Sequence, residues 1–398
     1  MNQDKHDLTG YPIAPIESFQ LPASLDGHNG TNRARDNHSQ LTADNDIDAI
    51  KAWLARFVDT KTTFDNYRKE AERLLLWSTI QMGKPISSLT HEDFLVFKRF
   101  LADPQPVQQW VMRDGRKFAR NHSDWRPFAG PLSPASQRQA SVILNTLFSW
   151  LVNAGYLAGN PLALSRQRTK TSTKRITRYL EEDIWNEVKI TIDLMPKETE
   201  REKERYYRTR WLFSLLYLCG LRISEVVTNT MGGFFARKDK DGESRWWLEI
   251  TGKGDKTRIV PATNELMVEL ARYRREKALS PYPLSGEAIP LLLPIGTQKR
   301  HMTRGAVHAL VKQVFGNTSQ RLRLRADEFS DVLADQVEKA SAHWLRHTAG
   351  SHMANQDVDL RHVRDNLGHE SISTTSLYLH STDDKRHRET EEKHKINW

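Results

Sequence analysis

A run of basic residues without a single acid divides this chain into two parts. Between residues 166 and 178 the sequence carries six arginines and lysines and no aspartate or glutamate. A solvated linker explains the polarity of this run but not its one-sided charge, so we expect a linker that follows nucleic-acid phosphates. The linker residues predicted to contact DNA are Arg166, Arg168, Lys170, Lys174 and Arg175.

The whole chain is also basic. Its 398 residues are long enough for two or three domains, and they carry a net charge of +9. A basic excess favours an anionic partner, most often nucleic acid. The single cysteine, Cys219, excludes an internal disulfide framework and a multi-cysteine metal site. Because no signal peptide or membrane-spanning stretch is recognisable, we expect a cytoplasmic protein.

The part before the basic run is predicted to be a helical DNA-binding domain at 46–165. Three of its segments show apolar residues at helical spacing. Ser133 followed by Pro134 is a typical helix start, because proline fits the first turn of a helix. Thr90 with Asp93 resembles a capping box. The predicted helices cover 64–83, 91–102 and 134–155.

Two stretches of this first part have no predicted regular structure. Residues 1–45 are polar and without periodicity, so we expect a disordered arm. Residues 105–131 form an insertion between helices, and loops of this length are commonly functional. The insertion mixes aromatic and basic side chains, which leaves a DNA contact and a plain surface flap both open. Its residues predicted to contact DNA are Arg113, Arg116, Lys117 and Arg120.

The part after the basic run mixes helices with one hairpin. RWWLEIT and TRIVPA are rich in β-forming residues, and the Gly-rich turn GKGDK between them predicts a β-hairpin. Most of the remainder is helical in pattern, including an extra surface helix expected at 318–341. We therefore expect a mainly α protein with a small β-hairpin or sheet. The helical N-terminal domain would be followed by a mixed, mostly helical catalytic domain at 179–380 and a tail at 381–398.

Four short motifs in the second part carry side chains suited to phosphoryl transfer. CGLRISEV holds Arg222, TGKGDKTRIVP holds Lys253, HWLRHTAGSHM holds His343 and Arg346, and LGHESISTTSLYLH holds His369 and Tyr378. His343 and Arg346 are three residues apart and therefore share one face of a helix. Each of these residues alone is more often structural than functional. Their ordered combination is what indicates chemistry.

Each residue type meets one need of a phosphodiester under attack. Two arginines can neutralise the negative charge on the non-bridging oxygens through paired N–H donors. A lysine on a hairpin can protonate the leaving oxygen, and histidines can bind the phosphate and accept a phenol proton. A tyrosine can act as the nucleophile and store the energy of the broken bond in a phosphate ester. This chemistry needs no metal, ATP or other cofactor, and no acidic cluster of the two-metal nuclease kind stands out.

The same motifs resemble the catalytic motifs of the tyrosine recombinases, which include phage integrases and the Xer resolvases. The resemblance covers residues 47–380 and is closest over 219–227, 251–261 and 343–380. It implies a two-domain clamp around duplex DNA and a site-specific recombinase that cuts and rejoins strands through a covalent 3′-phosphotyrosine. By this resemblance the active site consists of Arg222, Lys253, His343, Arg346, His369 and the nucleophile Tyr378.

Three other functions stay open at this stage. A type IB topoisomerase shares much of this chemistry but relaxes supercoils without a paired site. A DNA-binding accessory protein with an inactive site is disfavoured by the complete motif set. A metal-dependent nuclease or transposase would be excluded by cleavage that survives EDTA. For the recombinase we expect double-stranded DNA as partner and a homotetramer in the synaptic complex, and we leave open a partner recombinase or a directionality factor.

Overall fold

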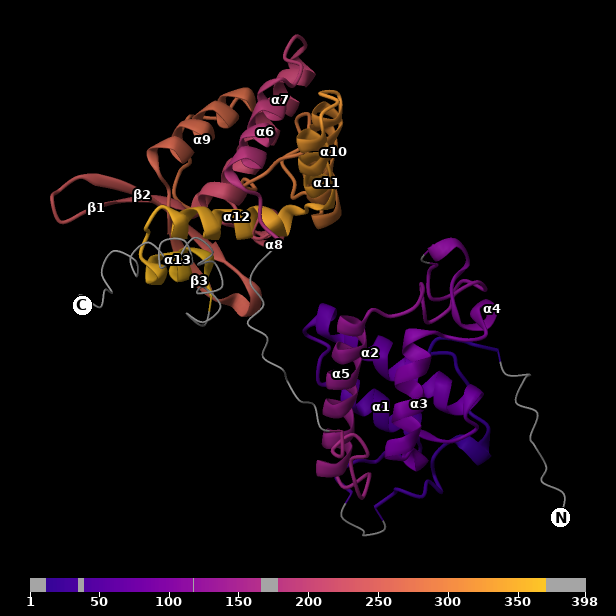
Figure 1. Ribbon diagram of the computed structural model, residues 1–398. Helices are drawn as coiled ribbons and strands as arrows, with labels where there is room; N and C mark the ends of the chain where they lie inside the picture. Colours follow the sequence, from indigo (N-terminus) through magenta and orange to yellow (C-terminus); the bar gives the residue numbers. More distant parts are fainter. Residues whose placement is uncertain (1–11, 35–38, 117, 166–177, 370–398) are drawn as a thin grey trace, which may run out of the picture. The chain divides into compact units, whose positions relative to one another are not determined.

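The chain forms two compact units, Met1–Thr169 and Lys170–Trp398, each with a hydrophobic core of its own (Figure 1). The structure is a computed structural model, and it describes residues 12–34, 39–116, 118–165 and 178–369. Among these residues, no helix combines the length and the apolar character that crossing a bilayer requires.

Five α-helices account for most of the regular structure described in the first unit. The start of α5 is confirmed, because Ser133 accepts a hydrogen bond from the Ser136 N–H and Pro134 occupies the first turn. The capping box of α3 is also confirmed, with the Thr90 N–H bound to the Asp93 carboxylate at 2.9 Å. The helices are α1 Asp46–Ala55, α2 Lys61–Leu76, α3 His91–Ala102, α4 Val107–Trp110 and α5 Pro134–Asn153, with a π-helical turn at Trp77–Gln81 and 3-10 turns at Ala23–Leu25, Ile86–Ser88 and Arg113–Gly115.

Aromatic side chains fill the core of the first unit. Trp53, Trp77 and Phe148 are almost completely buried. The centroid of the Trp77 ring lies 4.9 Å from that of Phe97, and the Phe94 ring meets Phe148 edge-on at 5.2 Å. Each such ring removes roughly 150–250 Å² of surface from water. These contacts join the π-helical turn after α2 to α3, and α3 to α5, in one core cluster.

The segment 12–34 packs against this core, so the prediction of a disordered arm at 1–45 is wrong for this stretch. Ile16 and Phe19 are buried within the core cluster. The Ile16 N–H donates to the Glu72 carboxylate at 2.9 Å. The apolar residues of this segment follow no helical or strand period, and their burial depends on contacts with helices that come later in the chain.

The insertion 105–131 also belongs to the core of the first unit, although it has little regular structure beyond α4. The side chains of Trp110, Trp125 and Phe128 are buried. Arg73 of α2 stacks its guanidinium over the Phe128 ring, with Cζ 4.5 Å from the centroid. The aromatic residues of the insertion are therefore core residues of this unit.

Arg120 holds the insertion to the rest of the first unit. Its guanidinium donates to the carboxylates of Glu17 and of the buried Glu72. Two carboxylates thus balance the charge of Arg120, and its contact with DNA stays a prediction. Arg113 and Arg116 are exposed on the same insertion, and their contact with DNA stays a prediction.

We expect Arg120→Met to lower the free energy of unfolding by about 1–3 kcal/mol, because it leaves the buried Glu72 carboxylate without its guanidinium partner. Urea unfolding followed by tryptophan fluorescence measures this loss. Arg116→Met is the matched control from the same insertion, and its exposed position predicts a change within about 0.5 kcal/mol. Equal stabilities of the two variants would contradict the structural role of Arg120.

Eight α-helices and three strands are described in the second unit (Figure 1). The helices are α6 Glu182–Asp193, α7 Glu200–Leu218, α8 Ile223–Thr228, α9 Asn264–Glu276, α10 Arg304–Arg323, α11 Glu328–Lys339, α12 Ala342–Asn355 and α13 Leu360–Leu367. The strands are β1 Phe234–Lys238, β2 Ser244–Thr251 and β3 Thr257–Pro261, and 3-10 turns lie at Met231–Gly233 and Lys253–Asp255. The prediction of a mainly α chain with a small sheet is confirmed.

The sheet is an antiparallel meander in the order β1-β2-β3. Strands β2 and β3 form the predicted hairpin, whereas β1 was not predicted. Phe234 of β1 pairs with Leu248 of β2, which in turn pairs with Val260 of β3. Paired residues share one face of a sheet, and all three side chains are buried there. This apolar row anchors the hairpin whose tip carries Lys253.

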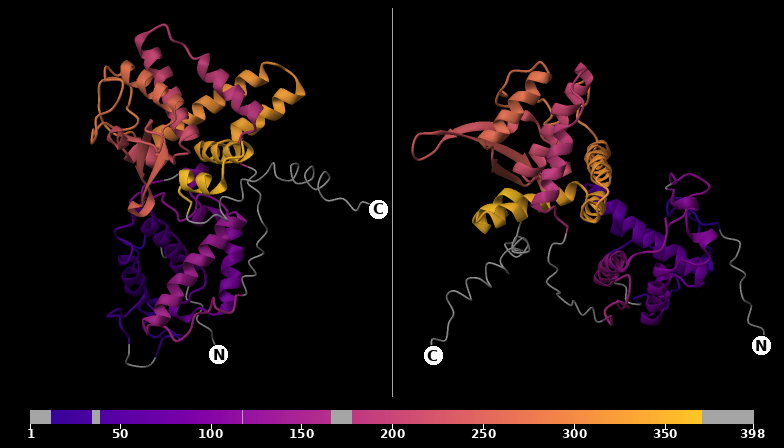
Figure 2. Two further views of the ribbon diagram at one scale, coloured as in Figure 1. Left: turned by 90° about the vertical axis from the view of Figure 1, so that its left-hand side faces the viewer. Right: turned by 45° about the horizontal axis from the view of Figure 1, so that its top comes forward.

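Helix α7 is the central helix of the second unit. Trp211 is fully buried within it and donates its indole N–H to the Leu291 carbonyl at 2.7 Å. α12 packs against α7, and α13 packs against both α12 and β3 (Figure 2). This packing brings the turn after α7, the helix α12 and the end of α13 close together. Three of the four sequence motifs lie on these segments.

Candidate active site

Arg222 stands at the start of α8, after a tight turn that requires glycine. Gly220 has a φ of +57°, and a Cβ atom there would lie 2.5 Å from Leu367 Cδ2. A side chain would be strained by both the backbone conformation and the contact. The Arg222 N–H and Nη1 donate to the Glu225 carboxylate at 2.8 and 2.9 Å. The Arg222 side chain is still 37% exposed, so part of its guanidinium is open to a ligand.

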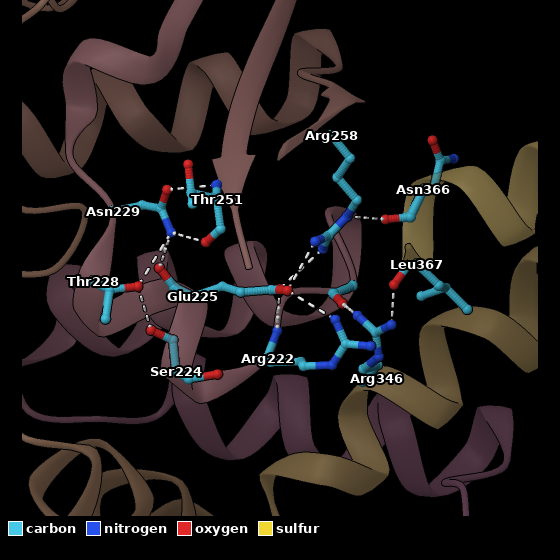
Figure 3. A network of polar contacts seen from close by, with 11 residues as sticks. Arg222, Ser224, Glu225, Thr228, Asn229, Thr251, Arg258, Arg346, Asn366 and Leu367 are labelled. Atoms are coloured by element: carbon cyan, nitrogen blue, oxygen red, sulfur yellow. Dashed lines mark hydrogen bonds and ion pairs between the residues drawn. The ribbon is translucent and has the colours of Figure 1, made fainter. Parts of the chain in front are cut away.

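Arg346 of α12 binds two other segments of the cluster. It is only 2% exposed. Its Nη1 donates to the Gly220 carbonyl, and its Nη2 donates to the Leu367 carbonyl (Figure 3). These carbonyls belong to the turn before Arg222 and to the last residue of α13. Arg346 therefore ties both segments to α12 and is much less accessible than Arg222.

Two histidines of α12 lie side by side. His343 and His347 are one helical turn apart, and their ring centroids are separated by 4.3 Å. Desolvation lowers the pKa of His343, and the charges of Arg346 and Arg222 lower it further. Desolvation and the neighbouring His343 lower the pKa of His347 to about 4. Both imidazoles are therefore mainly neutral at pH 7.

His369 joins these side chains from the end of α13. It follows Gly368, whose φ of +59° closes the helix in the left-handed conformation. Burial, then the charges of Arg346 and Arg222, lowers the pKa of His369 to about 4. Arg346 donates to the Leu367 carbonyl, two residues before His369, so it ties the segment that carries His369 to α12. At pH 7 the neutral imidazole can accept a proton.

The hairpin tip that carries Lys253 is attached to the segment that follows α8. The Thr251 N–H donates to Asn229 Oδ1 at 2.9 Å, and Asn229 Nδ2 donates to the Thr251 carbonyl at 3.0 Å. The Gly252 N–H then donates to the Lys256 carbonyl at 2.9 Å and closes the turn. The backbone of Lys253 thus begins a 3-10 turn at the tip of a hairpin that is attached to Asn229, at the end of α8.

Arg258 was not predicted as a site residue, yet it joins three segments of the cluster (Figure 3). Its Nη1 and Nη2 donate to the two oxygens of Glu225 at 2.8 and 2.9 Å. Its Nε donates to the Asn366 carbonyl at 3.0 Å. The sequence held one signal for this role. Strand alternation places Arg258 on the same face as the buried Val260, where a cation is expected to have a partner.

Glu225 is the common acceptor of the two arginines and is only 1% exposed. Burial alone raises the pKa of Glu225. The hydrogen bonds and the charge of Arg258 outweigh this effect and, together with those of Arg222, lower the pKa to about 2. The carboxylate is therefore ionised at any pH at which the protein would be expected to act.

The structure brings four of the six predicted catalytic residues into this cluster, namely Arg222, His343, Arg346 and His369. Lys253 is placed only through its backbone, at the hairpin tip. Several predicted positions lie outside the described residues: the nucleophile Tyr378 and the DNA-contacting Lys117, Arg166, Arg168, Lys170, Lys174 and Arg175. Their roles stay predictions.

Sequence comparison assigns the second unit to a known family. The Phage integrase family matches residues 191–385, the range that holds all four motifs. Residues 191–385 are a domain of this family, and the expected resemblance to the tyrosine recombinases is confirmed. It is similar to tyrosine recombinase XerC of Chlorobaculum parvum, with 28% identity over 277 residues, 65% of this chain and 74% of the relative. Tyrosine recombinase XerD of Yersinia pestis is 25% identical over 334 residues, 84% of this chain and 90% of that protein.

Solved structures of tyrosine recombinases share the fold. The XerH site-specific recombinase, in a pre-cleavage complex with its difH substrate, superposes with a TM-score of 0.56 at 17% identity and covers 96% of this chain and 99% of its own. The Tn1549 transposon integrase, in complex with transposon right-end DNA, gives a TM-score of 0.54 at 16% identity and covers 87% and 98%. The family match and the Xer relatives, together with this shared fold, confirm the expected enzyme class, a site-specific recombinase.

We expect Glu225→Gln to remove a pH-dependent part of the recombinase's stability. The folded-state pKa of about 2 lies below the ordinary 4.5, so the carboxylate stabilises the fold fully above pH 4.5 and loses this effect as the pH falls toward 2. The difference of 4.5 − 2 corresponds to about 3 kcal/mol at pH 7 and about 1.5 kcal/mol at pH 3. Urea unfolding at the two pH values measures it.

The control for this measurement is Glu243→Gln in the turn between β1 and β2. Glu243 is exposed, and its substitution should leave the free energy of unfolding nearly unchanged at both pH values. A stability loss in Glu225→Gln that is as large at pH 3 as at pH 7 would show that the ionised carboxylate is not its source.

Proposed function

We propose that this recombinase cuts a DNA strand through a covalent 3′-phosphotyrosine on Tyr378 and reseals it without metal or ATP. The observation that supports this most strongly is the convergence of Arg222, Arg346 and His369. These side chains come from three separate segments, which Arg346 joins through the Gly220 and Leu367 carbonyls. Guanidiniums bind phosphate oxygens through paired N–H donors, so a phosphodiester suits this cluster.

The arginines would stabilise the charge that develops at phosphorus. Arg222 has part of its guanidinium exposed and can donate to the non-bridging oxygens of the scissile phosphate. Arg346 is buried, so its main contribution would be to hold the turn around Arg222 and to add its positive charge from close by. The two arginines thus differ in role, although the motifs treat them alike.

The histidines and Lys253 would move the protons. His369 is neutral at pH 7 and can accept the phenol proton as the Tyr378 oxygen attacks phosphorus. The bond from phosphorus to the 5′ oxygen breaks, and Lys253 gives that oxygen a proton. The phosphate stays joined to the 3′ side of the DNA and to the tyrosine. Attack by another 5′ hydroxyl reverses these steps, so the ester itself supplies the energy for resealing.

We infer double-stranded DNA as the substrate. The similar XerH and Tn1549 integrase structures contain their DNA substrates, and the net charge of this chain is positive. Exchange between two duplexes requires four strand cuts, and each chain supplies one Tyr378. A homotetramer on two paired sites meets this requirement. A partner recombinase in place of identical copies, or an added directionality factor, is compatible with the same site.

We expect Tyr378→Phe to bind DNA like the wild type but to form no covalent adduct, because only the nucleophilic hydroxyl is lost. A suicide substrate, nicked beside the cleavage site mapped in DNA that flanks the gene, traps the adduct in the presence of EDTA. Denaturing gels with separately labelled 5′ and 3′ ends then show which end carries the protein. An adduct formed by Tyr378→Phe, or one joined to the 5′ end, would refute the mechanism.

Cleavage of sulfur-substituted DNA distinguishes a residue that donates a proton, such as Lys253, from one that stabilises charge, such as Arg222. A sulfur in place of the leaving 5′ oxygen departs without a proton, so this substrate should restore cleavage by Lys253→Ala. Arg222→Ala should lose roughly 10²–10³-fold in single-turnover rate on either substrate, as other enzymes do when an oxyanion donor is removed. Lys256→Ala is the control within the same turn. Rescue of Lys256→Ala, and not of Lys253→Ala, would transfer the proton-donor role to Lys256.

A further inference from the structure

Arg258 directs its side chain into the protein. The side chain is 13% exposed, and three of its N–H groups donate to Glu225 and to the Asn366 carbonyl. The planar guanidinium matches a carboxylate in a two-point contact that a lysine cannot reproduce. β3 is thereby fastened to α8 and to the end of α13 through one side chain.

One end of this connection reaches Arg222. Each oxygen of Glu225 accepts one hydrogen bond from each arginine. Oε1 accepts from Nη1 of Arg222 and Nη1 of Arg258, and Oε2 accepts from the Arg222 N–H and Nη2 of Arg258. The orientation of the carboxylate, and with it that of Arg222, therefore depends on Arg258.

The other end reaches His369. Asn366, whose carbonyl accepts from Arg258, precedes His369 by three residues. Gly368 lies directly against the Arg258 side chain, because a Cβ atom at 368 would be 2.8 Å from Cδ and 3.1 Å from Nε. The residue next to His369 is thus held by contact with the same arginine.

We propose that Arg258 is a positioning residue that sets Arg222 and His369 relative to each other for strand cleavage. Its donors face protein groups, so it would act on DNA only through these two residues. The inference rests on the proposed function, in which Arg222 and His369 are catalytic. It predicts that a single substitution of Arg258 changes the positions of both Arg222 and His369.

The second unit contains a matched control for this proposal. Arg274 of α9 donates through Nη1 and Nη2 to the two oxygens of Glu287 at 3.0 and 3.1 Å, and through Nε to the Ser280 carbonyl at 2.6 Å. Its side chain is 1% exposed. Arg274 therefore makes the same kind of contacts as Arg258, but none of its partners belongs to the candidate active site.

The first experiment compares Arg258→Lys with Arg274→Lys in the full-length protein. Single-turnover cleavage of the nicked suicide substrate is measured at saturating DNA, below the unfolding temperatures of both variants. We expect Arg258→Lys to cleave about 10²-fold more slowly with unchanged DNA affinity, because misplaced catalytic groups cost about this much. Arg274→Lys should cleave at the wild-type rate, although it also lowers the unfolding temperature.

The second experiment measures the effect of Arg258 on the pKa of His369 and needs no cleavage reaction. His369 faces the charges of Arg346, Arg222 and Arg258 and the imidazoles of His343 and His347. Arg258→Met removes one of these charges, so the pKa of His369 should rise. NMR titration of ¹⁵N-histidine-labelled protein measures the shift, and His369→Gln assigns the signal. Arg274→Met should leave the titration unchanged.

The outcomes separate this inference from the proposed function. A wild-type cleavage rate in Arg258→Lys, or equal rate losses in Arg258→Lys and Arg274→Lys, would overturn the positioning role while the mechanism stands. If wild-type protein forms no adduct, the proposed mechanism fails, and the His369 titration still tests whether Arg258 acts on that residue. An unchanged titration in Arg258→Met, or in Arg258→Gln if the methionine variant does not fold, would overturn that link.

Discussion

The buried carboxylate of Glu225 is the charge on which the candidate active site depends. A carboxylate taken out of water is unfavourable by several kcal/mol unless charged donors surround it. Here Arg222 and Arg258 supply four hydrogen bonds to its two oxygens. Because the two arginines come from different elements, the pairing that keeps Glu225 ionised also joins α8 to β3. Formation of the site and folding of this region are therefore one process.

The sequence predicted what local chemistry determines. Phosphoryl transfer demands particular side chains, so motifs around Arg222 and His369 were sufficient to name most of the cluster. Helix starts at Thr90 and Ser133 followed from local capping and were confirmed. The burial of Arg346 did not follow, because its carbonyl partners lie on distant segments. A motif names the residue types of a site but not how accessible each one is.

The remaining differences also come from contacts between distant residues. The structural role of Arg120 could not be predicted, because its partner Glu72 lies on α2, 48 residues earlier in the chain. The strand β1 has only two large apolar residues, Phe234 and Phe235, and these are adjacent, so its sequence shows no period of two. The charged stretch 318–341, expected as one extra surface helix, holds the end of α10 and all of α11, which buries Leu333 and Val337. In each case, contacts with residues distant in the sequence determine the structure, and the local sequence does not show them.

Two tight glycines of the candidate active site, Gly220 and Gly368, limit where this enzyme can be joined to its relatives in a hybrid. Gly220 lies against Leu367, and the adjacent Gly368 lies against Arg258, so the segments around 220, 258 and 368 are shaped to one another. A chimera whose junction falls between residues 220 and 368 would join surfaces that come from different parents. Junctions before residue 219 or after residue 369 keep these contacts within one parent, and they are the natural exchange points for building hybrid recombinases.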